Sequence, residues 1–265
     1  MNLKRYDIAQ AILNKLKGRL YLEIGVNKAN SFKRIVVEKK IGVDPLPTYN
    51  FINLLMQNAD IHYFSCTTDR SGSAQIKFNL KNKKNISKIT NSASCELFYV
   101  ISDVFFENYA SPVFRQNRID VAFIDGLHAY KQVVKDVGNT LRYLEKGGVI
   151  LIHDCNPPTE AAAYPAKSWK AASKMNIEGW TGQWCGDVWK SIVHLRAVRN
   201  DLEIFVLDCD YGIGVVRQGQ NKDPINMSIE EIEKMTYAEF NSNRKEMLNL
   251  KHQDYLYDFL EKISK

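Results

Sequence analysis

The chain has 265 residues, of which 45% are hydrophobic, and a formal net charge of +6. This length suits one large globular domain, alone or with a small appendage. No apolar run reaches the roughly 18 residues of a membrane span, and residues 1–20 lack the apolar core of a signal peptide. Five cysteines without Cys-x-x-Cys spacing argue against a zinc cluster and favour reduced thiols in the cytoplasm.

The first part of the chain predicts alternating helices and strands. Residues Ile8, Ile12, Leu13 and Leu16 mark one face of an N-terminal helix that ends near Gly18. A buried strand at 20–24 and a turn at Gly25 follow. Then come a helix through Phe32, Ile35 and Val36, a short strand at 39–44, a third strand at 96–101 and a helix at 104–109. The segment from 46 to 94 is unassigned except for a polar loop at 81–94.

The second part continues the alternation. Strands are expected at 121–124 and 149–152, with an amphipathic helix between them, and a hairpin at 203–207 and 213–217. The fold class predicted is α/β: a Rossmann-like, mostly parallel seven-stranded sheet with helices on both faces and an antiparallel terminal hairpin. We expect this domain to occupy residues 1–220. Residues 221–265 would form a helical extension, with a capping box at 228–231.

A glycine turn and a later acidic residue indicate a nucleoside cofactor. Glu23 and Gly25 follow the first strand directly, so the backbone there can approach a ligand. Asp44 ends the second strand and suits a ribose diol; the alternative is that it caps a turn. The Gly-x-Gly-x-x-Gly fingerprint is absent, so a nucleoside without a pyrophosphate fits better than a dinucleotide.

Several motifs together resemble the class I S-adenosylmethionine-dependent methyltransferases, and in particular their branch with an Asp-Gly-x-His-x-Tyr motif after the fourth strand. The matching stretches are Glu-Ile-Gly-Val at 23–26, Gly-Val-Asp-Pro at 42–45, Ser-Asp-Val-Phe-Phe at 102–106, Phe-Ile-Asp-Gly-Leu-His-Ala-Tyr at 123–130, Gly-Gly-Val-Ile-Leu-Ile-His-Asp at 147–154 and Gly-Asp-Val-Trp-Lys at 186–190. Ala29 stands where the family usually has a further glycine.

The resemblance implies S-adenosylmethionine as the cofactor and a role for each matching residue. Glu23 and Gly25 should lie near the methionine moiety, and Asp44 should hold the ribose hydroxyls. Residues Ser102 and Asp103 should lie near the adenine, whereas Asp125 and His128 should line the mouth shared by cofactor and acceptor.

Two histidines and two aspartates follow the fourth and fifth strands. His128 suits the base that takes a proton from a hydroxyl acceptor, with Asp154 as the other catalytic candidate; His128 could instead only bond its own loop. Asp125, His153 and Asp154 form a candidate divalent-metal set, in which the imidazole favours manganese, iron or zinc over magnesium. His153 could equally be a packed strand-end residue.

All four tryptophans lie at positions 169, 180, 184 and 189. Residues 156–187 are too long for an ordinary connection, so we expect a lid over the acceptor, with Trp189 packed in the core. Aromatic rings there suit a small-molecule or sugar-containing acceptor.

We therefore expect a cytoplasmic O-methyltransferase. The first alternative is a nucleotide-dependent oxidoreductase or epimerase on a similar sheet. The second is a non-catalytic protein that binds nucleic acid through the basic cluster Lys77–Lys88, although no aromatic residues are interleaved there.

Overall fold

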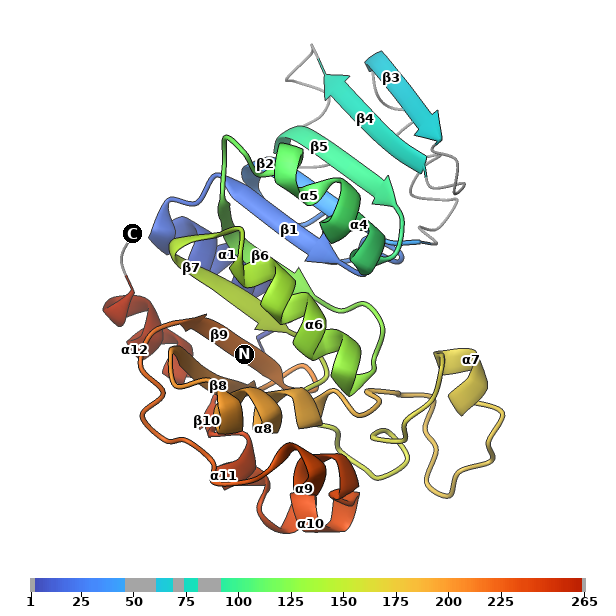
Figure 1. Ribbon diagram of the computed structural model, residues 1–265, viewed down its shortest axis with the longest axis vertical. Helices are drawn as coiled ribbons and strands as arrows, with labels where there is room; N and C mark the ends of the chain where they lie inside the picture. Colours follow the sequence, from blue (N-terminus) through green and yellow to red (C-terminus); the bar gives the residue numbers. More distant parts are fainter. Residues whose placement is uncertain (1–2, 46–60, 69–73, 81–91, 264–265) are drawn as a thin grey trace.

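The computed structural model of the chain describes residues 3–45, 61–68, 74–80 and 92–263. One mixed sheet runs through the molecule (Figure 1), in the order β10-β8-β9-β7-β6-β1-β2-β5-β4-β3. In chain order its strands are β1 Leu20–Ile24, β2 Val37–Val43, β3 Ile61–Thr68, β4 Ala74–Leu80, β5 Ser92–Tyr99, β6 Ile119–Ile124, β7 Leu144–Ile152, β8 Leu202–Asp208, β9 Ile213–Gln218 and β10 Leu250–His252.

The predicted fold class is confirmed. The five neighbours β5, β2, β1, β6 and β7 are parallel, and β9 is antiparallel to both β7 and β8. The prediction of seven strands was too low because three strands extend the sheet at its edges. Strands β3 and β4 add a hairpin beside β5, in the segment that the sequence left unassigned, and the three-residue β10 pairs with β8.

Helices cover both faces of the sheet. On one face lie α4 Ser102–Asn108, α5 Ala110–Val113, α6 Tyr130–Leu141 and α8 Trp189–Val198; on the other lie α1 Arg5–Leu16 and α12 Tyr255–Lys262 (Figure 1). The strands alternate accordingly: Leu20 and Leu22 pack in the core cluster of the first face, and Tyr21 packs in that of the second. Further short helices are α7 Trp169–Ala172, α9 Ile229–Lys234, α10 Tyr237–Ser242 and α11 Arg244–Met247.

The helix expected after Gly25 is absent. Residues 25–36 form turns instead, and Asn27 and Ala29 have φ angles of 44° and 57°, which an α-helix cannot contain. Phe32 and Ile35 are nevertheless fully buried. The spacing of these apolar residues therefore indicates that they are buried against the sheet, and it does not indicate a helix.

The C-terminal segment joins the main sheet through β10. The capping box predicted at 228–231 is present at the start of α9. Leu256 and Phe259 of α12 share a core cluster with Ile8 and Ile12 of α1. Besides its helices, this segment contains the strand β10, whose three residues are too few to predict from a sequence pattern. The domain boundary at residue 220 stays a prediction. In the described residues, no helix has the length and apolar character that crossing a membrane requires.

Ionisable side chains are buried within the central strands, among them Glu23 and Lys40. Glu23 of β1 is 2% exposed and accepts a 2.7 Å hydrogen bond from the Tyr21 hydroxyl, while Lys40 of β2 donates one of 2.6 Å to the Phe32 carbonyl. Burial raises the pKa of Glu23 to about 8, against the opposing effect of the Tyr21 bond. Glu23 is therefore mostly protonated at neutral pH.

This raised pKa predicts a pH-dependent stability. The unfolded chain releases the Glu23 proton near the ordinary value of 4.5, whereas the native state keeps it until about pH 8. The native state thus binds more protons between these values, and its stability falls as pH rises through them. The variant Glu23→Gln does not lose stability in this way. The difference in free energy of unfolding, variant minus wild type, should therefore increase by at least about 1 kcal/mol from pH 5 to pH 8.

The measurement is urea unfolding at both pH values, with Glu107→Gln as the control, because Glu107 is exposed on α4. If the difference between Glu23→Gln and wild type is the same at pH 5 and pH 8, Glu23 is ionised in the native state.

Candidate active site

The carboxyl ends of the parallel strands line one pocket of about 800 Å³. Strand β1 runs into Gly25, β2 into Asp44, β6 into Asp125 and β7 into His153. Each of these four residues donates its backbone N–H to a carbonyl at the end of the neighbouring strand, over 2.8–3.0 Å. The sheet ladder therefore extends into the pocket floor and fixes where each side chain starts.

The chain leaving β1 approaches the chain leaving β6 very closely at this edge. Gly25 has a φ angle of 89°, and a Cβ atom on it would overlap the backbone of Asp125 and Gly126. Only glycine fits here. Gly25 itself lines the pocket, and its contact with a ligand stays a prediction.

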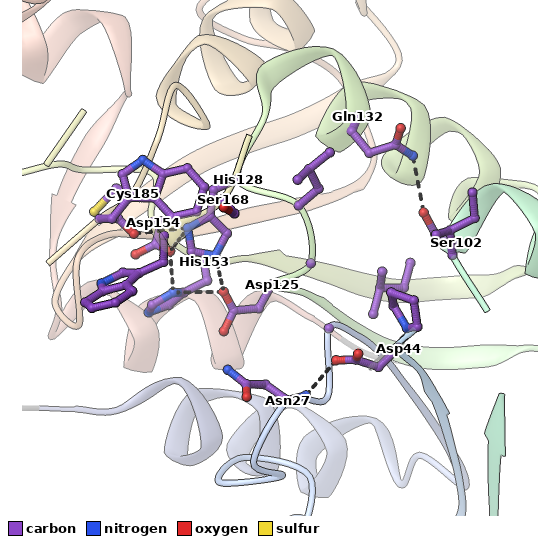
Figure 2. Close-up of a pocket in the computed structure, with 18 of the residues that line it drawn as sticks. Asn27, Asp44, Ser102, Asp125, His128, Gln132, His153, Asp154, Ser168 and Cys185 are labelled. Atoms are coloured by element: carbon purple, nitrogen blue, oxygen red, sulfur yellow. Dashed lines mark hydrogen bonds and ion pairs between the residues drawn. The ribbon is translucent and has the colours of Figure 1, made fainter. Parts of the chain in front are cut away.

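Asp44 and Asn27 lie side by side in one half of the pocket (Figure 2). The Asp44 carboxylate accepts a 2.7 Å hydrogen bond from the Asn27 backbone N–H. This bond holds the turn after β1 against the end of β2. Both residues line the pocket.

Ser102 and Asp103 open α4 and form the far wall of this half. Gln132 of α6 donates to the Ser102 hydroxyl over 3.2 Å and to the Asp103 carboxylate over 3.0 Å. Lys135 also bonds Asp103, and this bond is the main reason why the pKa of Asp103 is lowered. The wall therefore presents an ionised carboxylate held by two residues of α6.

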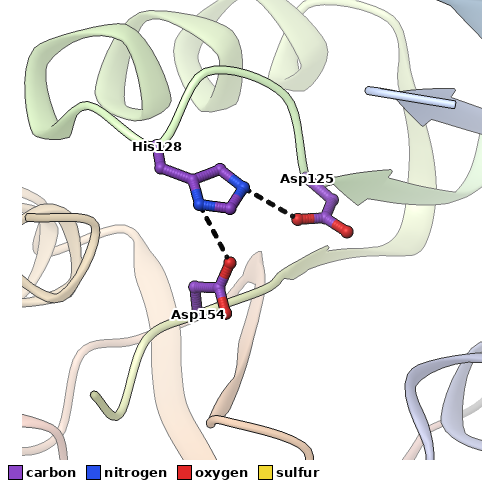
Figure 3. A group of neighbouring side chains, drawn as sticks. All are labelled: Asp125, His128 and Asp154. Atoms are coloured by element: carbon purple, nitrogen blue, oxygen red, sulfur yellow. Dashed lines mark ion pairs between the residues drawn. The ribbon is translucent and has the colours of Figure 1, made fainter. Parts of the chain in front are cut away.

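Four ionisable residues, Asp125, His128, His153 and Asp154, meet at the other end of the pocket; we call them the mouth cluster. His153 Nδ1 lies 3.2 Å from Asp125 Oδ1 and 3.1 Å from Asp154 Oδ2. His128 bridges the same two carboxylates (Figure 3), with Nε2 at 3.4 Å from Asp125 and Nδ1 at 3.2 Å from Asp154.

The charges of the mouth cluster support one another. Burial opposes protonation of His153, but Asp125 and Asp154 outweigh it and raise the pKa of His153 to about 10. Burial also opposes ionisation of Asp125, yet His153 and His128 hold the pKa of that carboxyl below its usual range. The same carboxylates raise the pKa of His128 against the effect of its burial.

Two residues that the sequence did not single out complete the floor. Arg5, at the start of α1, donates from Nη1 to Asp125 Oδ2 over 2.9 Å. Tyr211 comes from the turn between β8 and β9, and its ring meets the His153 ring edge-on at 6.2 Å. Because β9 is antiparallel to β8, the turn between them lies at the same edge of the sheet as the pocket. The predicted hairpin could therefore have placed Tyr211 near the site. No pattern in the sequence indicated Arg5.

The segment 156–187 forms the outer wall of the mouth. Its lining residues are Lys167, Ser168, Trp169, Gln183, Trp184 and Cys185. Trp184 stacks on His128 with ring centroids 4.8 Å apart, and its backbone carbonyl lies 3.0 Å from His128 Nδ1. Trp189 is buried and stacks on Phe240, as expected for a core residue.

The structure brings together all but one of the predicted site residues. Gly25, Asp44, Ser102, Asp103 and the whole mouth cluster line the pocket, whereas Glu23 does not. Glu23 points into the opposite face of the sheet with Tyr21, because side chains alternate along a strand. The basic residues Lys81, Lys83, Lys84 and Lys88 lie outside the described residues.

Residues 47–155 match a family model described as a methyltransferase domain. The uncharacterized protein R132 of Acanthamoeba polyphaga mimivirus is 28% identical over 138 residues, which cover 51% of this chain and 50% of that protein. The chain thus spans about half the length of this curated relative.

Two solved structures overlap most of the chain. An O-methyltransferase from Bacillus cereus in complex with SAH is 12% identical, with a TM-score of 0.48 and coverage of 82% of this chain and 83% of its own. A putative caffeoyl-CoA O-methyltransferase from Staphylococcus aureus is 14% identical, with a TM-score of 0.47 and coverage of 82% and 85%.

The family match covers the strands that carry Asp125, His128 and Asp154, and the sheet has the parallel centre and reversed last strand of the fold that the motifs resemble. The chain is therefore similar to methyltransferase domains over residues 47–155, which make up less than half of its length.

Proposed function

We propose that this protein transfers the methyl group of S-adenosylmethionine to a hydroxyl oxygen of a small-molecule or sugar-containing acceptor. The observation that carries the proposal is a single pocket with two chemically different halves. One half offers Gly25, Asp44 and Asp103 to a nucleoside, and the other offers the mouth cluster and an indole wall to an acceptor.

The cofactor half supports a nucleoside without a pyrophosphate. Asp44 reaches the pocket as an acceptor for the ribose hydroxyls, and Ser102 and Asp103 stand at the other wall for the adenine. An oxidoreductase that binds a dinucleotide needs a glycine-rich turn for the pyrophosphate. Here Gly25 is followed by Val26 and Asn27, whose backbone N–H is already taken by Asp44.

The acceptor half supports proton removal by His128. In its neutral form, with the proton on Nδ1, the His128 ring donates towards Asp154. Its Nε2, which lies 3.4 Å from Asp125 Oδ1, would then take the proton of an acceptor hydroxyl, and the carboxylates that raise the pKa of His128 make it a stronger base. The acceptor oxygen then attacks the methyl carbon, the carbon–sulfur bond breaks, and the hydroxyl proton passes to Nε2. Asp154 orients the ring and stabilises the imidazolium that forms, as in other aspartate–histidine pairs.

The mouth cluster also fits a divalent cation. Metal–ligand bonds of roughly 2.1 Å place adjacent ligands of an octahedral ion about 3 Å apart, and His153 Nδ1 lies 3.1–3.2 Å from oxygens of Asp125 and Asp154. His128 could replace His153, since Asp125, His128 and Asp154 offer ligand atoms within 4.8 Å of one another. We propose the His153 set, in which the ion would displace the proton that the two carboxylates favour on His153, because it leaves His128 Nε2 to take the proton of the acceptor. A bound ion would supply Lewis acidity to the acceptor oxygen.

We propose that residues 156–187 act as a lid. The ends of the segment are fixed: Cys185 donates to the Ala162 carbonyl, and Asp187 accepts from the first N–H of α6 at Tyr130. Between them α7 reaches away from the sheet (Figure 1), and Trp169 is 53% exposed although it lines the pocket. Closure over an acceptor would bury this ring and exclude water from the transfer.

Asp44 provides the direct test of cofactor identity. We expect calorimetry to show that the protein binds S-adenosylhomocysteine and not NAD. Asp44→Ala should weaken this binding by roughly 1.5–3 kcal/mol, because the ribose loses a charge-assisted partner. Asp201→Asn, at an exposed ion pair with Arg199, is the control. An unchanged dissociation constant in folded Asp44→Ala would remove Asp44 from the cofactor site.

His128→Ala should lower turnover by about 10²–10⁴-fold, the usual contribution of a general base, while S-adenosylhomocysteine affinity stays nearly intact. The assay requires an acceptor found by screening sugars, catechols and hydroxylated metabolites for methyl transfer. His252→Ala serves as the control, because the His252 side chain is exposed and forms its ion pair with Asp254 at the surface. Turnover within a few-fold of wild type would make His128 structural and leave Asp154 as the alternative.

Hydrogen exchange tests the lid. Amides of residues 165–182 should exchange several-fold more slowly once S-adenosylhomocysteine is bound, because closure orders the segment. The helix α6 provides the internal reference and should change little. Strong protection of residues 165–182 in both states would show that the segment is permanent core.

A further inference from the structure

Arg5 reaches the pocket from the start of the N-terminal helix α1. Its guanidinium has two anchors. Nη1 donates to Asp125 Oδ2 over 2.9 Å, and Nε donates to Asp210 Oδ2 over 2.9 Å. The Arg5 backbone N–H donates to the same oxygen of Asp210 over 3.0 Å. The side chain is therefore held from both sides of the pocket floor.

The two anchors are unequal. Asp210 lies in the turn between β8 and β9, its side chain is 4% exposed, and it takes both the backbone and the side chain of Arg5 as well as a 3.4 Å contact from Lys4. From Arg5, Asp125 accepts a single hydrogen bond, the one from Nη1. Arg5 can consequently leave Asp125 while Asp210 keeps it in place.

The Nη1 atom touches two of the three groups that would bind a metal ion. Besides its bond to Asp125, it lies 3.4 Å from His153 Nδ1. A cation coordinated by Asp125 and His153 would meet the positive charge of Arg5 at about the same distance, where repulsion between charges is strong unless water intervenes. The guanidinium and a divalent ion would therefore compete for the negative charge of Asp125, Arg5 at Oδ2 and the ion at Oδ1.

We propose that Arg5 is an internal counter-ion that competes with a divalent cation for Asp125, so that the cation binds only when the guanidinium withdraws to Asp210. The proposal rests on the metal set of the proposed function, and it makes the N-terminal helix a control element for that site. Without the cation, Arg5 keeps Asp125 paired, and Asp125 stays oriented with Oδ1 towards His128 and His153.

The test is the affinity of the full-length protein for Mn²⁺ alone, measured from the electron paramagnetic resonance signal of free Mn²⁺. Arg5→Met and Arg5→Gln remove the competing charge and should bind Mn²⁺ at least tenfold more tightly than the wild type. Arg5→Lys keeps the charge and should remain close to the wild type. Arg19→Met is the matched control: it removes the same charge next to β1 at the other edge of the sheet, where Arg19 pairs with the exposed Glu38.

Asp125→Asn combined with Arg5→Gln should abolish the gain, which assigns it to the mouth cluster. A thermal shift with S-adenosylhomocysteine shows that each variant is folded and tests the cofactor half separately, so a failure of the methyltransferase proposal appears there and not in the Mn²⁺ series. The Gln variant can still donate hydrogen bonds to Asp125 and Asp210 if the Met variant does not fold. Folded Arg5→Gln that binds Mn²⁺ no more tightly than wild type, or an equal gain in Arg19→Met, would overturn the proposal.

Discussion

The arrangement of the site depends on one backbone constraint, the continuation of the sheet ladder past the ends of its parallel strands. Gly25, Asp44, Asp125 and His153 are each the first residue after a strand, and each still donates a hydrogen bond to the neighbouring strand. Parallel strands cannot be displaced singly without breaking bonds on both sides. The side chains that begin at these positions are therefore placed by the most rigid part of the molecule.

This rigidity allows the pocket floor to hold buried charges. His153 and Asp154 are 5% and 4% exposed, and isolated charges at such positions would be strongly destabilising. They are tolerated because the two groups carry opposite charges and lie at a hydrogen-bonding distance of 3.1 Å from each other. Arg5 adds a further partner for Asp125. The same pairing that stabilises the floor sets which of its groups can take a proton or a cation.

The two halves of the pocket differ in how they are built. The cofactor half consists of strand ends and the start of α4, tied together by Asn27–Asp44 and by Gln132 with Ser102 and Asp103. The acceptor half depends on residues 156–187, whose fixed points lie near its two ends. Under the proposed function, this division would place the nucleoside on the sheet and the acceptor under a wall that closes over it.

The sequence by itself determined the alternation of strands and helices, the common edge at which Gly25, Asp44, Asp125 and His153 meet, and the reversed last strand. These features follow from local patterns: short buried runs, glycine turns and amphipathic helices, each readable within about ten residues. Glu23 was misplaced because its motif adjoins the pocket in sequence, while the alternation of side chains along β1 turns it to the other face. The turns at 25–36 were predicted as a helix, because over so short a stretch buried turn residues can have the same apolar spacing as one face of a helix.

Only the tertiary structure decided the partners of the charged groups. Arg5 is separated by 120 residues from Asp125 and by 205 from Asp210, and no local pattern marks it. Its place follows from the packing of α1 against β6 and β7, which carries the start of the helix to the pocket floor. The contact of Trp184 with His128 likewise arises from the path of the chain after β7. Local patterns specify elements and their order, whereas the pairing of distant charges depends on how those elements pack.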